Sequence, residues 1–338
     1  MLIIFIVSEK EDLMILKDKV SILIPVYNRE KLIEQTVRSA MNQTYKNIEI
    51  IIVDNKSTDN TWEILNTLAN QDNRIKIFQN ETNIGPVRNW KRCIDEANGE
   101  YVKILWSDDL IAPTFIEKTL PFVVDNEDVG FVFTTTEIFY DNTNKRLKTY
   151  NIGETGIYDT QLYIESSLLG KPFDVPVSPG NALFRKKDID KNLLVDIPNK
   201  IGSDFKMHAI GNDALIYLLT AKDYPKFAFV NEILAFFRAH NGSISISTNQ
   251  HNMTILYNLA KTYFVENYLT DKRLIKKFNA KLWLILIKNG STINISKVHD
   301  FYFNKSEVKI DYLYLFKFII KKLFKYFKNQ EGKNGTHK

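Results

Sequence analysis

Two adjacent acids, Asp108 and Asp109, follow an apolar run that is typical of a strand, Tyr101-Val-Lys-Ile-Leu-Trp106. One interpretation is a solvated turn. The alternative is a cation site, because Mg²⁺ and Mn²⁺ prefer oxygen ligands and usually combine few carboxylates with substrate phosphates. The apolar Leu110-Ile111 comes directly after the pair. Two solvated charges are unusual in that position, which favours the cation site.

Two more polar segments with chemically useful side chains follow predicted strands. Asp54 opens the loop Asp54-Asn-Lys-Ser-Thr-Asp-Asn60. This loop is either a turn that ends in a helix cap, or a place where a carboxylate accepts hydrogen bonds from a nucleotide base. Arg88 falls in the first turn of a helix that begins after Gly85. It is either a solvated cation or the partner of a bound anion, since a cation there opposes the helix dipole.

Two later residues have both a structural and a chemical interpretation. Asp213 precedes the helical pattern Ala214-Leu-Ile-Tyr-Leu-Leu219, so it is either an N-cap or a general base facing a cleft. His240 ends an apolar strand and is either a structural histidine or a ligand. Cys93 lies in a helical pattern, where a small buried apolar residue is the expected role.

An α/β domain must position these groups, because short apolar runs alternate with helical patterns in the first part of the chain. The alternation predicts a mostly parallel central sheet flanked by helices. In such sheets, ligands bind beyond the carboxyl ends of the strands, where the polar segments meet. Residues 141–180 are turn-rich and carry no readable motif, whereas residues 254–288 and 312–328 have helical patterns. The predicted strands are 20–25, 47–53, 75–78, 101–106, 129–133, 182–184, 227–230 and 233–237.

Composition restricts the class of protein. The 338 residues are 44% hydrophobic and 25% charged, which is typical of a folded globular chain. A single cysteine excludes an intramolecular disulfide and fits a reducing, cytoplasmic location. The apolar stretch Met1–Val7 is too short to span a bilayer and lacks signal-peptide features, so we expect a dispensable extension, with Met14 as an alternative start.

The positive charge of the chain is concentrated near its end. Seven lysines and one acid follow Leu313, while the formal net charge of the whole chain is only +5. The rest of the chain is therefore close to neutral and shows no electrostatic footprint for nucleic acid. Residues 315–328 place Phe316, Ile319 and neighbouring apolar residues on one helical face and lysines on the other, which predicts a basic amphipathic helix. It suits an anionic membrane surface, or packs on the protein itself.

The order and spacing of these motifs resemble those of the family 2 glycosyltransferases. These are inverting, metal-dependent sugar transferases of the GT-A fold, typical of bacterial polysaccharide assembly. The resemblance covers approximately residues 19–248. It rests on the stretches Val20-Ser-Ile-Leu-Ile-Pro-Val-Tyr-Asn28, Ile51-Ile-Val-Asp-Asn-Lys-Ser-Thr-Asp-Asn-Thr61, Asn83-Ile-Gly-Pro-Val-Arg-Asn89, Leu105-Trp-Ser-Asp-Asp109, Ser178-Pro-Gly-Asn181, Asn212-Asp213 and Arg238-Ala-His-Asn-Gly-Ser243.

The resemblance implies a donor site for a nucleotide-diphosphate sugar, usually a UDP-sugar. Pro25, Val26 and Tyr27 would line the nucleotide pocket. Asp54 would hydrogen-bond the base, and Arg88 would lie near the nucleotide.

The resemblance also implies a metal site with Mn²⁺ or Mg²⁺ as the cofactor. Asp108 would contact the ribose or the sugar. Asp109 would hold the metal against the diphosphate, and His240 would help to hold the metal or the diphosphate. Gly180 and Asn181 fall in a loop that lies near donor and acceptor in the family.

Asp213 would be the catalytic base that deprotonates the acceptor hydroxyl. Two departures from the family pattern stand close to these residues. Trp106 occupies the place where many members have the first acid of the metal motif, and Asn212 replaces the usual acid beside the base. Metal binding would then rest on Asp108 and Asp109.

The implied protein is a hexosyl- or N-acetylhexosaminyl-transferase with a hydroxyl acceptor on a glycan or lipid-linked saccharide in cell-surface polysaccharide synthesis. We expect it on the cytoplasmic face of the cell membrane. The alternatives are a sugar-nucleotide nucleotidyltransferase and a non-catalytic, membrane-associated partner that keeps the GT-A fold. The predicted domains are an N-terminal extension (1–18), a GT-A catalytic domain (19–248), a helical C-terminal region with the basic amphipathic helix (249–330) and a disordered tail (331–338).

Overall fold

The computed structural model describes residues 18–141, 143–240, 242–243, 248–289, 295–304 and 307–320. Almost all of the predicted N-terminal extension and the whole predicted tail therefore lie outside the described residues. The chain divides into two compact units, Met1–Ile197 with Ser203–Lys261 and Pro198–Gly202 with Thr262–Lys338. The predicted domain boundary after residue 248 precedes this division by several residues and stays a prediction.

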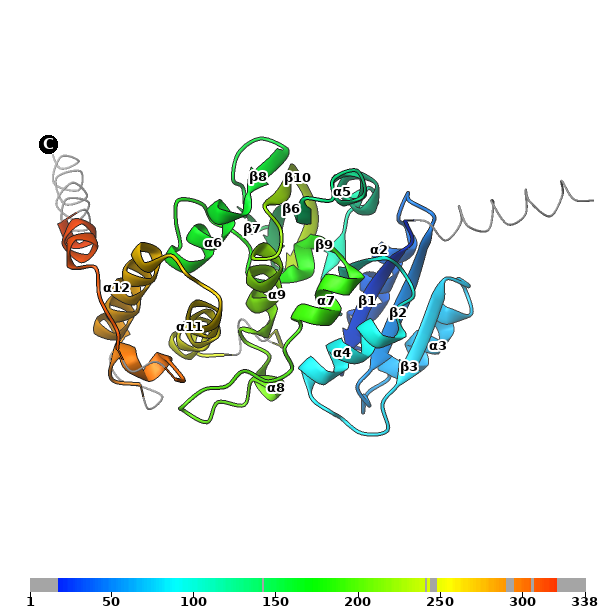
Figure 1. The fold of residues 1–338 in the computed structure, drawn as a ribbon. Helices are drawn as coiled ribbons and strands as arrows, with labels where there is room; N and C mark the ends of the chain where they lie inside the picture. Colours follow the sequence, from blue (N-terminus) through cyan, green and yellow to red (C-terminus); the bar gives the residue numbers. More distant parts are fainter. Residues whose placement is uncertain are drawn as a thin grey trace, which may run out of the picture. The chain divides into compact units, whose positions relative to one another are not determined.

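A mixed sheet forms the centre of the first unit (Figure 1). Its strand order in the described residues is β3-β2-β1-β4-β9-β6-β10-β5, with β7 paired to β6 and β8 paired to β10. The strands are β1 (Val20–Val26), β2 (Ile48–Asp54), β3 (Ile75–Gln79), β4 (Tyr101–Ile104), β5 (Leu110–Ile111), β6 (Val129–Phe139), β7 (Arg146–Thr149), β8 (Gly156–Asp159), β9 (Ala182–Arg185) and β10 (Lys226–Arg238).

Helices cover both faces of this sheet. The helices α2, α3 and α5 pack over one face, and α4, α7 and α9 pack over the other. Strands that are buried on both faces are mostly apolar, which is why β1 and β2 appear in the sequence as apolar runs interrupted by few polar residues. The helices are α2 (Ile33–Met41), α3 (Thr61–Ala69), α4 (Pro86–Glu96), α5 (Phe115–Val124), α6 (Thr160–Leu169), α7 (Lys186–Asn192), α8 (Phe205–His208) and α9 (Asn212–Ala221).

The first four strands agree with the sequence-based prediction. β1 pairs in parallel with β2 and β4, and β2 pairs in parallel with β3. Their carboxyl ends therefore lie at one edge of the sheet, as the alternation of strands and helices predicts. Cys93 is fully buried in α4, and burial raises the pKa of its thiol, which confirms its packing role.

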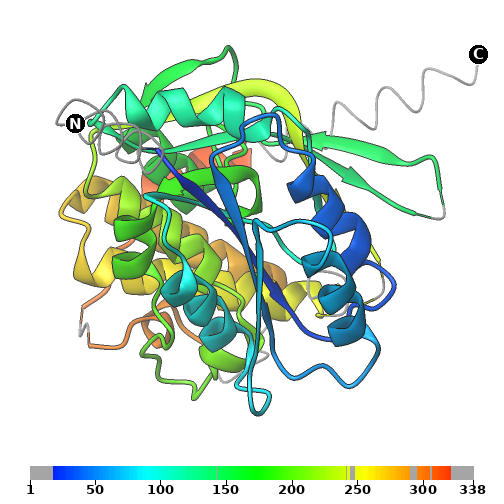
Figure 2. The same cartoon turned by 90° about the vertical axis from the view of Figure 1, so that its right-hand side faces the viewer.

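The second half of the sheet differs from the prediction. β9 is antiparallel to β4 and β6, whereas β6 and β10 pair in parallel, so the sheet beyond the first four strands is mixed rather than mostly parallel. The predicted strands 227–230 and 233–237 form the single strand β10, which pairs with β6 through register shifts around Ile233. The turn-rich stretch 141–180 contains β7, β8 and α6, and the β6–β7 hairpin projects from the sheet in Figure 2.

The second unit is built on helices. The pattern at 254–288 forms two helices, α11 (Gln250–Asn267), which begins in the first unit, and α12 (Lys272–Asn289). A 3-10 turn, η2 (Val298–Phe301), follows, and residues 312–320 are helical. The Asn279 side chain joins these segments, since its Nδ2 donates to the Lys309 carbonyl and its Oδ1 accepts from Tyr302. In the part of the chain that the structure describes, no helix is both long and apolar enough to cross a bilayer.

Candidate active site

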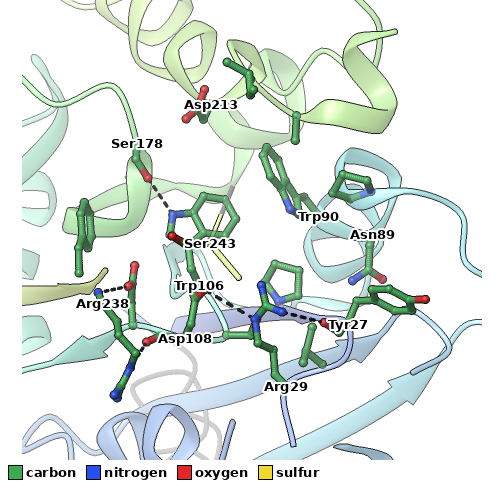
Figure 3. A pocket seen from close by; sticks show the side chains of 18 of the residues that line it. Tyr27, Arg29, Asn89, Trp90, Trp106, Asp108, Ser178, Asp213, Arg238 and Ser243 are labelled. Atoms are coloured by element: carbon green, nitrogen blue, oxygen red, sulfur yellow. Dashed lines mark hydrogen bonds and ion pairs between the residues drawn. The ribbon is translucent and has the colours of Figure 1, made fainter. Parts of the chain in front are cut away.

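A cavity of about 580 Å³ lies beyond the carboxyl ends of β1 and β4 (Figure 3). Apolar and aromatic side chains form much of its wall, together with a few acids and amides. The cavity brings together six residues that the sequence singles out, namely Pro25, Val26, Tyr27, Asp108, Asp109 and Asp213. Five other candidates are not among the described residues that line it, namely Asp54, Arg88, Gly180, Asn181 and His240.

Asp54 is the last residue of β2 and is fully buried. Its carboxylate accepts hydrogen bonds from the Ser57 hydroxyl and backbone N–H and, at 2.8 Å, from Gln79 Nε2. These bonds fix the turn after β2 and position the next residue, Asn55, in the cavity wall. The contact of Asp54 with a nucleotide base stays a prediction.

Arg88 lies in the first turn of α4, as the sequence predicts. The helix begins after Gly85, whose φ of 84° is a conformation that favours glycine, and Pro86 occupies its first turn. The Arg88 side chain is exposed, whereas Asn89 and Trp90, the next two residues, line the cavity.

Asp108 is held between two basic side chains. Its Oδ2 lies 2.9 Å from His240 Nε2 and 3.6 Å from Arg29 Nε. Arg29 lines the cavity. Its Nε–H group is buried and donates no hydrogen bond to any of the described residues. The sequence motifs did not single out Arg29. His240 therefore contacts Asp108 but is not among the residues that line the cavity. Its role in holding a metal or the diphosphate stays a prediction.

Asp109 is buried at the base of the cavity. Its Oδ1 accepts a hydrogen bond of 2.8 Å from the Arg238 backbone N–H. Burial and the neighbouring charge of Asp108 raise the pKa of Asp109, because the charges of Lys103 and Arg238 compensate its negative charge only in part.

This donor set fits a divalent cation that is shared with a ligand. Asp108 and Asp109 face one cavity, and a cation would supply the positive charge that the buried Asp109 lacks. Within the described ranges, no group of three or more His, Cys, Asp or Glu side chains could hold a metal without further ligands. Two carboxylates that leave coordination positions open match the way Mg²⁺ combines protein carboxylates with phosphates.

Trp106, in the position where an acid is usual, anchors a loop. Its Nε1 donates a hydrogen bond of 2.8 Å to Ser178 Oγ, as Figure 3 shows. The indole packs so closely on Gly180 that a Cβ there would lie 2.9 Å from the ring. The fully buried Lys103 donates to the Gly180 carbonyl from below, and Asn181 donates to the Thr134 carbonyl at 2.9 Å. Gly180 and Asn181 are thus buried supports behind the cavity wall.

Asp213 lies in the first turn of α9 and is 7% exposed. Its Oδ1 accepts hydrogen bonds from the backbone N–H groups of Gly211 at 3.0 Å and Ala214 at 2.8 Å, and its Oδ2 accepts from the Tyr257 hydroxyl at 2.9 Å. Burial raises the pKa of Asp213 to about 6, although these hydrogen bonds act in the opposite direction. A carboxylate with this pKa is ionised at neutral pH and basic enough to accept a proton. Asn212 is turned toward the Leu194 carbonyl.

Trp90, Met253 and Tyr257 line the cavity but belong to none of the sequence motifs. The rings of Trp90 and Trp106 lie 4.7 Å apart and both line the cavity. Met253 and Tyr257 come from α11, after the last recognisable motif. Only the tertiary fold brings Tyr257 to Asp213, which is 44 positions away in the chain, so periodicity could not have identified it.

Comparison with solved structures defines the class of fold. The structure of S. aureus TarS residues 1–349 in complex with UDP-GlcNAc matches with a TM-score of 0.59 and 17% sequence identity. The match covers 80% of this chain and 73% of that one. This protein therefore has the GT-A fold, as the sequence predicts.

Sequence comparison identifies the family. The model of glycosyl transferase family 2 matches residues 21–193, half of the chain. Glycosyltransferase GlyG of Streptococcus pneumoniae is 30% identical over 230 residues, which cover 68% of this chain and 73% of GlyG. An uncharacterized glycosyltransferase of Haemophilus influenzae is 42% identical over 107 residues, 32% of this chain, and the match spans only 43% of that relative. The chain belongs to glycosyltransferase family 2.

Proposed function

We propose that this protein transfers a sugar from a nucleotide-diphosphate donor to a hydroxyl acceptor, with inversion at the anomeric carbon. One observation carries the proposal. The Asp108–Asp109 pair and Asp213, whose pKa is raised to about 6, line a single cavity. The Asp108–Asp109 pair can hold the diphosphate through a cation, and Asp213 can take a proton from the acceptor.

The reaction is one in-line displacement. The acceptor hydroxyl attacks the anomeric carbon from the face opposite the nucleotide, and its proton passes to Asp213. The bond from the anomeric carbon to the diphosphate oxygen breaks, and the electron pair leaves with the nucleotide diphosphate. A bound Mn²⁺ or Mg²⁺ supplies Lewis-acid stabilisation of that leaving charge. Asp109 would hold the cation and Asp108 the ribose or sugar, with His240 and Arg29 orienting Asp108.

We propose a UDP-sugar as the donor, because the structural neighbour TarS was solved with UDP-GlcNAc. In this proposal Pro25, Val26 and Tyr27 line the uridine pocket, Asp54 positions the loop that meets the base, and Arg88 lies near the nucleotide. Gly180 and Asn181 support the wall between donor and acceptor. The sugar is a hexose or an N-acetylhexosamine.

We further propose that the acceptor is a hydroxyl of a glycan or lipid-linked saccharide at the cytoplasmic face of the membrane. The second unit exposes large apolar side chains beside basic ones such as Lys276 and Lys317, a combination that suits an anionic lipid surface. The exposed apolar residues are Trp283, Ile287, Tyr312, Leu313, Phe316 and Ile319. The lysine-rich continuation of the last helix, residues 321–328, lies outside the described residues.

Sedimentation with vesicles tests the membrane proposal. The full chain should sediment with vesicles of phosphatidylglycerol and phosphatidylcholine, and deletion of residues 312–338 should release it. Unchanged sedimentation of the truncated chain would contradict the role of this segment.

A donor panel tests the proposed function. UDP-, GDP- and dTDP-sugars are each titrated into the protein with Mn²⁺, and nucleotide release is followed. We expect Mn²⁺-dependent binding of a UDP-sugar, lost in Asp109→Ala and in the near-isosteric Asp109→Asn, while Asp128→Asn at an exposed position binds normally. Binding without nucleotide release under any condition would support the non-catalytic alternative. A nucleotidyltransferase is not favoured, since the chain belongs to a family of sugar transferases.

A further inference from the structure

Helix α11 contributes to the active site although it lies beyond residues 21–193, which the family model matches. Met253 and Tyr257 of this helix line the same cavity as Asp213. The Tyr257 hydroxyl donates a hydrogen bond of 2.9 Å to Asp213 Oδ2. The remaining carboxylate oxygen, Oδ1, is held by the backbone N–H groups of Gly211 and Ala214.

This arrangement fixes the plane of the carboxylate from both sides. Oδ1 accepts two hydrogen bonds, which match its two lone pairs, so it has no room for a substrate proton. Oδ2 accepts one hydrogen bond, from Tyr257, and keeps one lone pair for another donor. The oxygen that can receive a proton is therefore the one that Tyr257 orients.

We propose that Tyr257 is a positioning residue, which aims Asp213 Oδ2 at the acceptor hydroxyl and stabilises the ionised carboxylate before transfer. This inference rests on the proposed role of Asp213 as the base. When the acceptor oxygen bonds to the anomeric carbon, its proton goes to Oδ2 and the donor electron pair leaves with the diphosphate. Tyr257 keeps its own proton throughout.

The electrostatic surroundings of Asp213 support this role. Burial and the charge of Asp213 raise the pKa of Tyr257, so the phenol remains a donor at neutral pH. Lys261, one turn further along α11, is buried, and burial lowers its pKa to about 8 while Asp213 acts to raise it. Its Nζ donates to the Ser167 carbonyl at 2.7 Å. Among the described residues, the charge of Asp213 acts to raise the pKa of Tyr257 and Lys261 from α11, Tyr163 from α6, Tyr217 from α9 and Tyr150.

The test is the pH profile of Tyr257→Phe, with Tyr263→Phe in the same helix as the matched control. UDP release is measured between pH 5 and pH 9 with the UDP-sugar that the donor panel selects, water serving as the acceptor. The activity of the wild type should fall below about pH 6, where Asp213 takes up a proton. Loss of a hydrogen bond to a carboxylate raises the pKa of that carboxylate by about one unit. The acidic limb of the pH profile, which is the fall in activity at low pH, should therefore move to higher pH by about one unit in Tyr257→Phe. The acidic limb of Tyr263→Phe should lie at the same pH as that of the wild type.

A fluorinated tyrosine at position 257 gives the converse readout with little change in shape. Its phenol is a stronger donor, so the acidic limb should move to lower pH. A uniform loss of activity at every pH, with the limb unmoved in both variants, would overturn the inference and leave Tyr257 a purely structural residue. UDP binding by isothermal titration should be unchanged in both variants, and weaker binding would equally contradict a role confined to Asp213.

The variant Asp213→Asn separates this inference from the proposed function. If Asp213→Asn transfers the sugar normally, the proposed base is wrong. If Asp213→Asn is inactive but the limb stays in place in Tyr257→Phe and in the fluorotyrosine protein, only the positioning role fails.

Discussion

Replacing Asp213 by asparagine should stabilise the protein at neutral pH while it removes activity. The Asp213 side chain is 7% exposed, and burial raises its pKa from the ordinary 3.8 to about 6. The native carboxyl thus keeps its proton up to about pH 6, whereas the unfolded carboxyl releases it near pH 3.8. Stability therefore decreases as the pH rises from about 4 to 6, and the loss persists above pH 6.

The size of the effect follows from the two pKa values. A difference of about 2 pH units corresponds to about 3 kcal/mol of lost stability at pH 7.5. At pH 5 fewer than half of the native Asp213 carboxyl groups have released their proton. The lost stability at pH 5 is therefore smaller than at pH 7.5 by roughly 1–1.5 kcal/mol. An asparagine carries no charge, and its Oδ1 can still accept from the Gly211 and Ala214 backbone N–H groups. Asp213→Asn should therefore lack most of this pH-dependent loss of stability.

Urea denaturation of the wild type and Asp213→Asn at pH 5 and pH 7.5 measures this difference. The variant should be the more stable protein at pH 7.5, and its advantage should grow by roughly 1–1.5 kcal/mol between the two pH values. Asp128→Asn, at an exposed position, is the control and should show no such growth. A constant difference at both pH values, or a less stable Asp213→Asn, would refute the reasoning.

Two further predictions concern other parts of the first unit. Gly180→Ala places a Cβ 2.9 Å from the Trp106 ring and 3.1 Å from Phe237, so the loop must shift. Turnover should therefore fall at least ~10-fold. The free energy of unfolding measured in urea should change by only about 1–3 kcal/mol. Glu49 is buried, which raises its pKa, but hydrogen bonds from Lys76, Ser21, Asn98 and Lys19 lower it to about 2. Its contribution to stability should therefore be lost as the pH falls from about 4.5 to 2, and Glu49→Gln should flatten acid denaturation over that range; an unchanged acid profile would contradict this.

The first half of the fold could be predicted because its signals are local. The largely apolar runs of β1 and β2 indicate strands that are buried on both faces, and Gly85-Pro86 marks the start of α4. The parallel connections then place the strand ends at one edge of the sheet. Tyr27 and Asp108, which follow β1 and β4, line one cavity as this arrangement predicts.

The stretch 141–180 could not be predicted because its elements lack the usual periodic signals. β7 is mostly exposed and shows no alternation of apolar and polar residues. α6 is buried on most of its surface, so its apolar residues form no single stripe. The antiparallel position of β9 between β4 and β6 depends on pairing between distant segments, which sequence spacing does not specify.

The site shows the same division between local and distant signals. Asp108, Asp109 and Asp213 stand out by type and spacing, whereas Arg29 and Tyr257 acquire meaning only through contacts with them. Trp106 departs from the family pattern, and its hydrogen bond to Ser178 Oγ gives the departure a structural use. A residue whose role depends on a partner more than forty positions away cannot be identified from its own neighbours in the chain.

Comparison of donor binding with transfer in Asp213→Asn tests the central claim most directly. The UDP-sugar selected by the panel is titrated with Mn²⁺ into the wild type and into Asp213→Asn, and UDP release is measured under the same conditions. Because Asp213 is proposed to act only on the acceptor proton, binding should be retained and turnover should fall by about 100-fold or more. Wild-type turnover by Asp213→Asn would contradict the account.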